Sequence, residues 1–286
     1  MIYLDNSATT NPKPQVVKNA VSKAMNYYSF NSGRGGYKES VNTSNMIFTV
    51  REKIADMFSF LPQNIAFVPN CTFALNYAIK GIAKPGDHFI ISNLEHNAVV
   101  RPIYSLYEKG IISYDAAKFS SDKEETINNF KSLIKANTKA IVCMHASNVF
   151  GCVFPIKEIG KLAHDNGIIF IVDAAQSAGV LDIDANRDNI DILCTPGHKG
   201  LYAPMGSGFI AVGDGITLDT IIEGGTGSMS MILSQPKDLP DRLESGTLNN
   251  VAICGLAAGI DFVNSKKIDN IYNHEKSLMN MVYKEM

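Results

Sequence analysis

The feature that most constrains the fold is an alternation of short apolar runs with longer stretches of helical period. Strand–helix–strand units cross over with right-handed connections, so this alternation predicts an α/β fold on a mostly parallel sheet. The expected strands are Ile65–Val68, His88–Ser92, Ala140–Met144, Ile168–Val172, Ile190–Cys194 and Gly208–Val212.

The segments between the strands predict helices. We expect them at Thr72–Ile82, Ala98–Lys109, Lys123–Lys135 and Pro155–Asn166, with two more before the first strand at Val16–Tyr28 and Lys38–Phe58 and another beginning near Asn250. The link TPGHKGLYAPMGS is too rich in Gly and Pro for a crossover helix. The strand after it, Gly208–Val212, is therefore expected to run antiparallel to its neighbours.

Size and charge limit the class of protein. At 286 residues the chain is near the length at which a second lobe is expected. We predict an N-terminal arm over 1–14, a large domain over 15–249 and the start of a small C-terminal domain over 250–286. The net charge of −2 gives no indication of nucleic acid or of an anionic membrane as a partner.

Targeting and metal-binding signals are missing from the sequence. No apolar run approaches the roughly 18 residues of a membrane helix, and the first residues, MIYLDNSATT, are unlike a signal peptide, which predicts a cytoplasmic location. The five cysteines are scattered, without the spacing of a zinc site or a disulfide framework.

Polar side chains follow the expected strands at their carboxyl ends, where open parallel sheets bind ligands. Few such residues occur inside the strands themselves. The residues that follow five of the strands are Asn70, Cys71 and Thr72; His96; Asn148; Asp173 and Gln176; and Thr195, His198 and Lys199. Since these ends share one edge of the sheet, the side chains are expected to lie together.

This set of residues fits pyridoxal phosphate chemistry. The cofactor needs a lysine for a Schiff base, and Lys199 is the candidate. It also needs a carboxylate facing its ring nitrogen, for which Asp173 is placed. Thr72 opens a helix whose backbone N–H groups suit a phosphate, and Cys71 adjoins it.

The remaining polar residues have subsidiary expected roles. His96 would stack on the ring, Asn148 and Gln176 would hydrogen-bond its phenolic oxygen, and Thr195 and His198 are further phosphate ligands. Each residue also has a simpler structural interpretation: an aspartate after a strand is often a helix cap, and a lone lysine is usually solvated. Those interpretations explain poorly why all of the residues fall at one edge.

Several motifs resemble class V aminotransferase-fold enzymes, most closely the cysteine desulfurases and selenocysteine lyases. They are YLDNSATT (3–10), LEHNA (94–98), HASNVFG (145–151), VDAAQSAG (172–179) and GHKG (197–200), extended by NSGRGGYKES (31–40), GGTGS (224–228) and LESGTLN (243–249). The resemblance covers nearly the whole chain. It implies pyridoxal-phosphate fold type I, with a mostly parallel seven-stranded sheet flanked by helices and a small C-terminal domain.

The resemblance also implies roles for individual residues. Lys199, His96 and Asp173 would be the catalytic residues, and Thr226 would reach the phosphate in the other subunit of a homodimer. Arg34 would belong to an active-site loop. Pro196 departs from the family, which often has Ser at that position and so gains a phosphate donor that this chain lacks; Thr195 is the expected substitute.

The implied function is a cysteine desulfurase-like transferase or lyase that removes sulfur or selenium from cysteine-type amino acids through a Lys199 aldimine. A sulfur-acceptor protein is a further expected partner. The substrate-carboxylate arginine and the sulfur-accepting cysteine are expected beyond Met286, so we expect this stretch alone not to release sulfur from cysteine. Two alternatives remain open: an aminotransferase or other lyase of the same fold, and a non-catalytic cofactor-binding or assembly domain.

Overall fold

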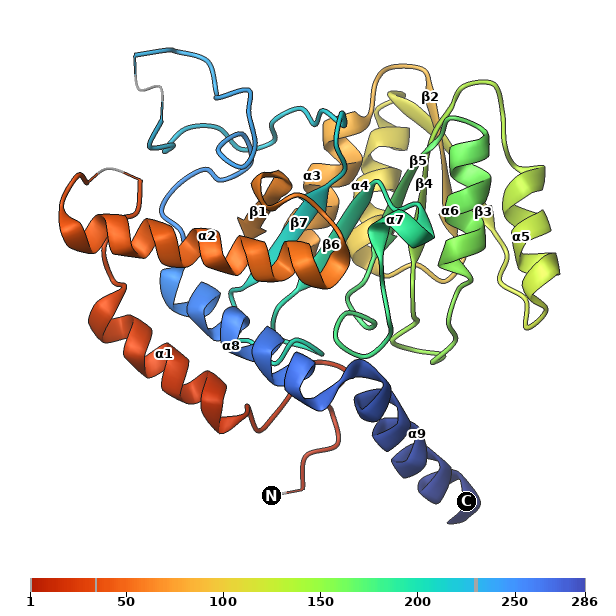
Figure 1. The fold of residues 1–286 in the computed structure, drawn as a ribbon. Coiled ribbons are helices and arrows are strands. Elements are labelled where there is room, and N and C mark those ends of the chain that lie inside the picture. The colour runs from red at the N-terminus through yellow and green to blue at the C-terminus, as the bar shows by residue number, and fades with distance from the viewer. Residues whose placement is uncertain (1, 34, 229–230, 286) are drawn as a thin grey trace.

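The computed structural model describes residues 2–33, 35–228 and 231–285 of the chain. They form a seven-stranded sheet in the order β1-β7-β6-β5-β4-β2-β3 (Figure 1). The strands are β1 (Ile65–Val68), β2 (Asp87–Ser92), β3 (Ile112–Ala117), β4 (Thr138–Met144), β5 (Ile169–Asp173), β6 (Ile192–Pro196) and β7 (Gly208–Val212). The predicted α/β class and mostly parallel sheet are confirmed.

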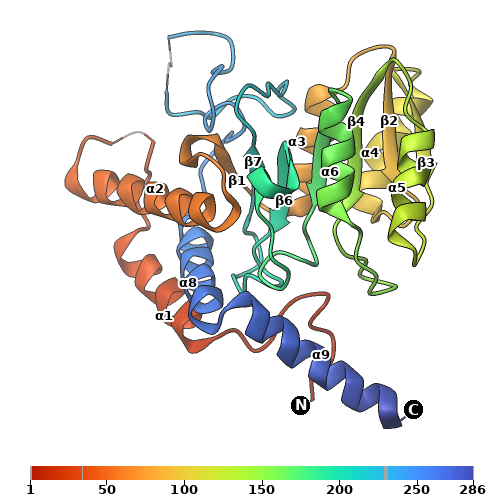
Figure 2. The ribbon, with the colours of Figure 1, turned by 45° about the vertical axis from the view of Figure 1, so that its right-hand side comes forward.

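Helices cover both faces of the sheet (Figures 1 and 2). On one face lie α3 (Cys71–Ile82) and α4 (Asn97–Glu108); the other face is covered by α2 (Lys38–Phe58), α6 (Ile156–Asp165) and α8 (Asn250–Lys266). The remaining helices are α1 (Gln15–Tyr27), α5 (Lys123–Ser132), the short α7 (Ala185–Asp188) and α9 (Ile268–Glu285), with one 3-10 turn at Pro62–Asn64.

The two-sided cover explains why the central strands are continuously apolar. Successive side chains of a strand point to opposite faces. In β4, Ala140 and Val142 belong to the core under α3 and α4, whereas Ile141 and Cys143 belong to the core under α2 and α6. Both sets are fully buried, as expected for a parallel sheet with helices on each side.

Strand β7 is antiparallel to both of its neighbours, β1 and β6, as the Gly- and Pro-rich link predicts. Strand β6 differs from its prediction because it lies two residues further along the chain. Thr195 pairs with Phe209 and Pro196 with Gly208, so both residues belong to the strand rather than to the loop after it. Pro196 is the last residue of the strand, a position where its missing N–H costs little.

Strand β3 was missed, and its composition explains why. It is an edge strand, paired only with β2, and its sequence ISYDAA has no apolar run. Its Asp115 accepts hydrogen bonds from buried His88, at 3.1 Å, and from Lys135, at 2.5 Å. The polar residue in the strand therefore has partners that only the tertiary structure supplies.

Helix α8 begins at Asn250, where a helix is expected, and the Asn249 side chain caps it by accepting the Ala252 N–H at 3.1 Å. The helix packs against α1 and α2, and α9 projects from its end (Figure 2). The division into an arm and two domains stays a prediction. Within the described residues, no helix combines the length and apolar character needed to cross a membrane.

The segment between β7 and α8 carries little regular structure and is anchored by a buried ion pair. Arg51 of α2 makes two hydrogen bonds to Glu244, at 2.8 and 2.7 Å, and both side chains are 7% exposed. Glu244 also accepts the Phe67 N–H at 2.6 Å, and the Arg51 guanidinium lies over the Phe67 ring. These contacts attach the segment to the edge strand β1.

Candidate active site

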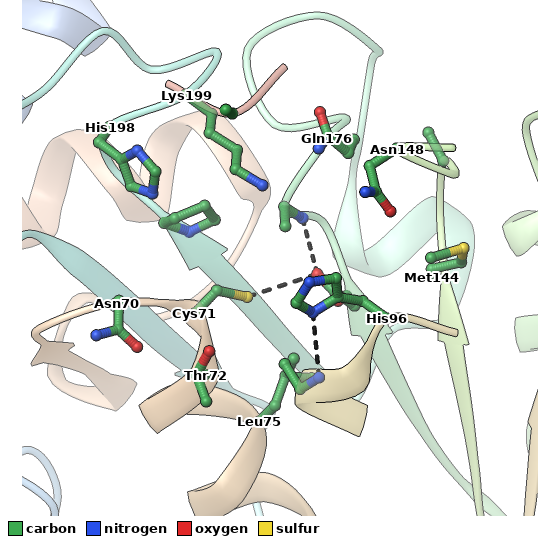
Figure 3. Close-up of a pocket in the computed structure, with 16 residues that line it drawn as sticks. Asn70, Cys71, Thr72, Leu75, His96, Met144, Asn148, Gln176, His198 and Lys199 are labelled. Carbon is green, nitrogen blue, oxygen red and sulfur yellow. Dashed lines mark hydrogen bonds between the residues drawn. The ribbon is translucent and has the colours of Figure 1, made fainter. Parts of the chain in front are cut away.

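A cavity of about 270 Å³ lies at the carboxyl ends of the central strands (Figure 3). Its walls come from the ends of β4, β5 and β6, the loops after them and the starts of α3 and α4. The structure brings eight of the predicted site residues to this cavity: Cys71, Thr72, His96, Asn148, Asp173, Gln176, His198 and Lys199. A concave site with a few convergent polar groups is the usual form of a small-molecule site.

Asp173 is the last residue of β5, and its side chain is buried. Its Oδ1 accepts the Ala175 N–H at 2.9 Å and the Cys71 thiol at 3.5 Å, and no described residue donates to Oδ2. Burial raises the pKa of Asp173, whereas the Ala175 N–H, the Cys71 thiol, Lys199 and His96 lower it. A cationic group at Oδ2 would therefore stabilise the ionised form.

Lys199 reaches into the cavity from the loop after β6 (Figure 3). His198 beside it is half-buried, and its Nδ1 lies 3.0 Å from the Thr9 hydroxyl. The pKa of His198 is lowered by burial and by the charges of Lys199 and Lys13, so the imidazole is neutral at pH 7.

The start of α3 forms the opposite wall. Asn70 caps the helix by accepting the Phe73 N–H at 3.2 Å. A helix N-terminus leaves backbone N–H groups without intrahelical partners and carries partial positive charge, so this wall suits an anion. The Thr72 hydroxyl stands at the same end, and the buried Cys71 thiol, whose pKa burial raises, stays protonated and can donate to Asp173.

His96 caps α4 from the cavity side. Its Nδ1 accepts the Ala98 N–H at 3.1 Å, so the ring proton of the neutral imidazole is on Nε2. The cap fixes the ring at the cavity (Figure 3). Asn148 and Gln176 enter from the other side, and Gln176 donates to the Ser7 carbonyl at 3.1 Å.

Two of the named residues lie away from this cavity. Thr195 is buried within β6, and its Oγ1 has no hydrogen-bond partner among the described residues. Thr226 lines a second cavity, of about 480 Å³, together with Arg51 and Glu244. Arg34 lies outside the described residues. Their roles stay predictions.

Glu95, which has no role predicted from the sequence, lies between the ends of β2 and β4. Its Oε1 accepts the Ser92 hydroxyl at 2.5 Å and the Met144 N–H at 2.8 Å. These bonds tie the loop that carries His96 to the end of β4. Its Oε2 is buried without a hydrogen-bond partner among the described residues. The available signal was an acidic residue three positions after the end of an apolar strand.

The environment of Glu95 favours a neutral carboxylic acid. Burial raises its pKa from 4.5 to about 8, and nearby Asp173 adds to the rise, while the hydrogen bonds from Ser92 and Met144 oppose it. Burial raises the pKa of nearby Cys143, and a negative charge on Glu95 would raise it further. Near neutral pH, Glu95 therefore holds the two strand ends together without adding a second buried negative charge.

This predicts a pH-dependent effect of Glu95→Gln on stability. The unfolded chain loses the Glu95 proton above its ordinary pKa of 4.5, whereas the folded chain keeps it until about pH 8, so the free energy of unfolding falls as pH rises between these values. Glutamine cannot ionise. Urea unfolding at pH 5, 6.5 and 8 should show the variant gaining stability relative to wild type by roughly 1 kcal/mol or more.

Glu124→Gln, which removes an exposed negative charge at the start of α5, serves as the control. A constant difference between Glu95→Gln and wild type at all three pH values would contradict the assignment of a protonated Glu95.

Three comparisons place the chain among known proteins. The Aminotransferase class-V family profile matches residues 2–286. A probable cysteine desulfurase of Methanothermobacter thermautotrophicus is 31% identical over 281 residues, which cover 96% of this chain and 69% of the relative. The cysteine desulfurase IscS of Clostridium botulinum is 32% identical over 232 residues, which cover 78% of this chain and 56% of the relative.

Solved structures agree with the sequence relatives. The apo structure of a cysteine desulfurase from Thermococcus onnurineus NA1 superposes with a TM-score of 0.90 at 28% identity, covering 99% of this chain and 72% of that one. The structure of SspA in complex with cysteine gives a TM-score of 0.79 at 30% identity, covering 91% and 72%. The chain therefore belongs to the class V aminotransferase family, and within it to the cysteine desulfurase branch.

Proposed function

We propose that this protein binds pyridoxal 5′-phosphate in the cavity at the strand ends and acts on cysteine or a related amino acid. The observation that supports this most is the convergence of Lys199 and Asp173 on one cavity beside a helix N-terminus. An amine, a buried carboxylate and an anion site are the three groups that this cofactor needs. The cytoplasmic location predicted from the sequence belongs to the same proposal.

The residues present fit the cofactor at its two charged ends. Asp173 is buried with one oxygen free of hydrogen bonds from the described residues, which suits a protonated ring nitrogen. The start of α3 with Thr72, and His198 across the cavity, suit the phosphate. Bound there, the cofactor supplies an electron sink for bonds at the substrate α-carbon.

Around that group, the side chains of the chain have distinct roles. Lys199 holds the cofactor and moves a proton at the substrate α-carbon. His96, fixed by its cap on α4, packs on the ring and orients it, and Asn148 and Gln176 hydrogen-bond the ring oxygen. The neutral thiol of Cys71 holds the Asp173 carboxylate in one rotamer.

The proposed substrate follows from the relatives, which include cysteine desulfurases and a protein solved with cysteine bound. Release of sulfur needs a nucleophilic thiolate as acceptor. Four of the five cysteines of this chain are buried, and burial raises the pKa of all five, including partly exposed Cys152. We therefore assign the acceptor role to none of these five cysteines. As a further partner we propose a sulfur-acceptor protein, which relatives named cysteine desulfurase IscS favour.

The chemistry at Lys199 gives a direct test of this function. The protein should take up pyridoxal phosphate and turn yellow, and borohydride should convert the band into a stable adduct that peptide mapping places on Lys199. Adding cysteine should change the spectrum before reduction. Lys199→Ala should abolish the adduct, whereas Lys80→Ala, which removes another partly buried lysine in the last turn of α3, should keep it. No uptake, or an adduct on another lysine, would refute the assignment.

We further propose that the protein is a homodimer with shared sites. Thr226 lies apart from the main cavity, on a separate hollow beside α2. The resemblance gives it a contact with the cofactor phosphate in the partner subunit. Apolar side chains on α2 are exposed, including Val41 and Phe48 with exposed fractions of 45% and 49%. A partner subunit packed on α2 would cover them.

Subunit mixing tests this sharing. Thr226→Ala alone should weaken cofactor binding, and Lys199→Ala alone should form no reducible adduct. In a mixed dimer, the site that contains Lys199 receives Thr226 from its partner, so half of the sites should bind cofactor tightly again. The readout is the yield of borohydride adduct at limiting cofactor, alongside sedimentation for the dimer. A yield no higher after mixing than before would exclude shared sites.

A further inference from the structure

The N-terminal arm lies against the peptide that carries Lys199. Thr10 donates its backbone N–H to the His198 carbonyl at 3.2 Å and its hydroxyl to the Lys199 carbonyl at 2.6 Å. Lys13 donates to the His198 carbonyl at 2.7 Å and to the Thr10 hydroxyl at 3.0 Å. Residues nearly 190 positions apart in sequence are thus joined at His198 and Lys199, two residues of the proposed site.

The position of the Thr9 proton follows from counting donors and acceptors. The Thr9 hydroxyl lies 3.1 Å from the His198 carbonyl oxygen and 3.0 Å from His198 Nδ1, but it has one proton to donate. Lys13 and the Thr10 N–H already occupy the two lone pairs of that carbonyl. The Thr9 hydroxyl therefore donates to Nδ1, and the hydroxyls of Thr9 and Thr10 then each have an acceptor of their own.

This arrangement fixes the tautomer of His198. An imidazole whose Nδ1 accepts a hydrogen bond carries its proton on Nε2. Burial and the charges of Lys199 and Lys13 keep the ring neutral. The side chain lines the cavity (Figure 3), so the neutral His198 offers a ring N–H donor rather than a lone pair. An anion such as a phosphate needs a donor.

We propose that the N-terminal arm is part of the cofactor-binding machinery, an inference that rests on the function proposed above. Thr10 and Lys13 position the His198–Lys199 peptide. Thr9 sets the His198 tautomer, so that the Nε2–H of His198 donates to the phosphate. The motif at residues 3–10 thereby acquires a physical role. Thr9, Thr10 and Lys13 are positioning residues, since they act through His198 and Lys199.

The test compares three variants by cofactor affinity. Thr9→Val removes the hydroxyl at nearly constant volume, Thr9→Ser retains it, and Thr43→Val removes a buried hydroxyl that bonds only within α2. Spectroscopic titration with pyridoxal phosphate should show Thr9→Val raising Kd about tenfold or more, the worth of a hydrogen bond to a charged group. Thr9→Ser and Thr43→Val should bind like wild type.

A second measurement reads the tautomer itself. In protein labelled with ¹⁵N at histidine, two-bond ¹H–¹⁵N correlations distinguish the two neutral forms, and His198→Gln assigns the signal. Wild type should show the Nε2–H form of His198. Thr9→Val should shift it toward the Nδ1–H form, and Lys13→Met should do so in part, because it frees a lone pair of the His198 carbonyl for the Thr9 hydroxyl.

Other outcomes would overturn the inference. An unchanged Kd or an unchanged His198 tautomer in Thr9→Val would overturn it while leaving the Lys199 adduct, and so the proposed function, intact. A fall in the melting temperature of the cofactor-free protein that accounts for the whole loss of affinity would also overturn it, since the arm would then be only a structural clamp. If wild type binds no pyridoxal phosphate, both proposals fail.

Discussion

The structure depends on the parallel register of β4, β5 and β6. Asp173 pairs with Met144 on one side and with Cys194 on the other, so β4 and β5 end at one level and β6 continues two residues beyond it. Parallel strands place their carboxyl ends at the same edge. The loops that follow therefore deliver the polar side chains to one cavity, while the strand interiors stay apolar and hold the sheet between its two helical layers.

The two buried carboxyl groups near the site, those of Asp173 and Glu95, differ in protonation. Asp173 lines the cavity and has donors among the described residues on one oxygen alone, whereas burial holds nearby Glu95 as a neutral acid. Two buried carboxylates in one region would repel each other if both were ionised. One carboxylate is thus kept for a cationic partner, and the other connects strand ends. His198, also neutral, gains its orientation from the N-terminal arm.

The sequence was sufficient for the fold class and for eight of the residues that line the cavity, because both follow from apolar periodicity and from the residues that follow each strand. Thr195, predicted with them, is instead buried within β6. The sequence was not sufficient where a contact with a residue distant in the chain determines a segment's structure or a residue's role. Strand β3 has a polar sequence that only His88 and Lys135 explain. The role of Glu95 depends on the Met144 N–H, and that of Thr9 on the His198 ring. Such pairings have no local signature.

The central claim is that Asp173 holds a cofactor ring nitrogen in its protonated form. The measurement that tests it most directly is ¹⁵N NMR of ring-labelled pyridoxal phosphate bound to wild type and to Asp173→Asn. We expect a protonated ring nitrogen in wild type and an unprotonated one in the variant, with the borohydride adduct on Lys199 in both. A ring nitrogen whose protonation is the same in the two proteins would contradict it.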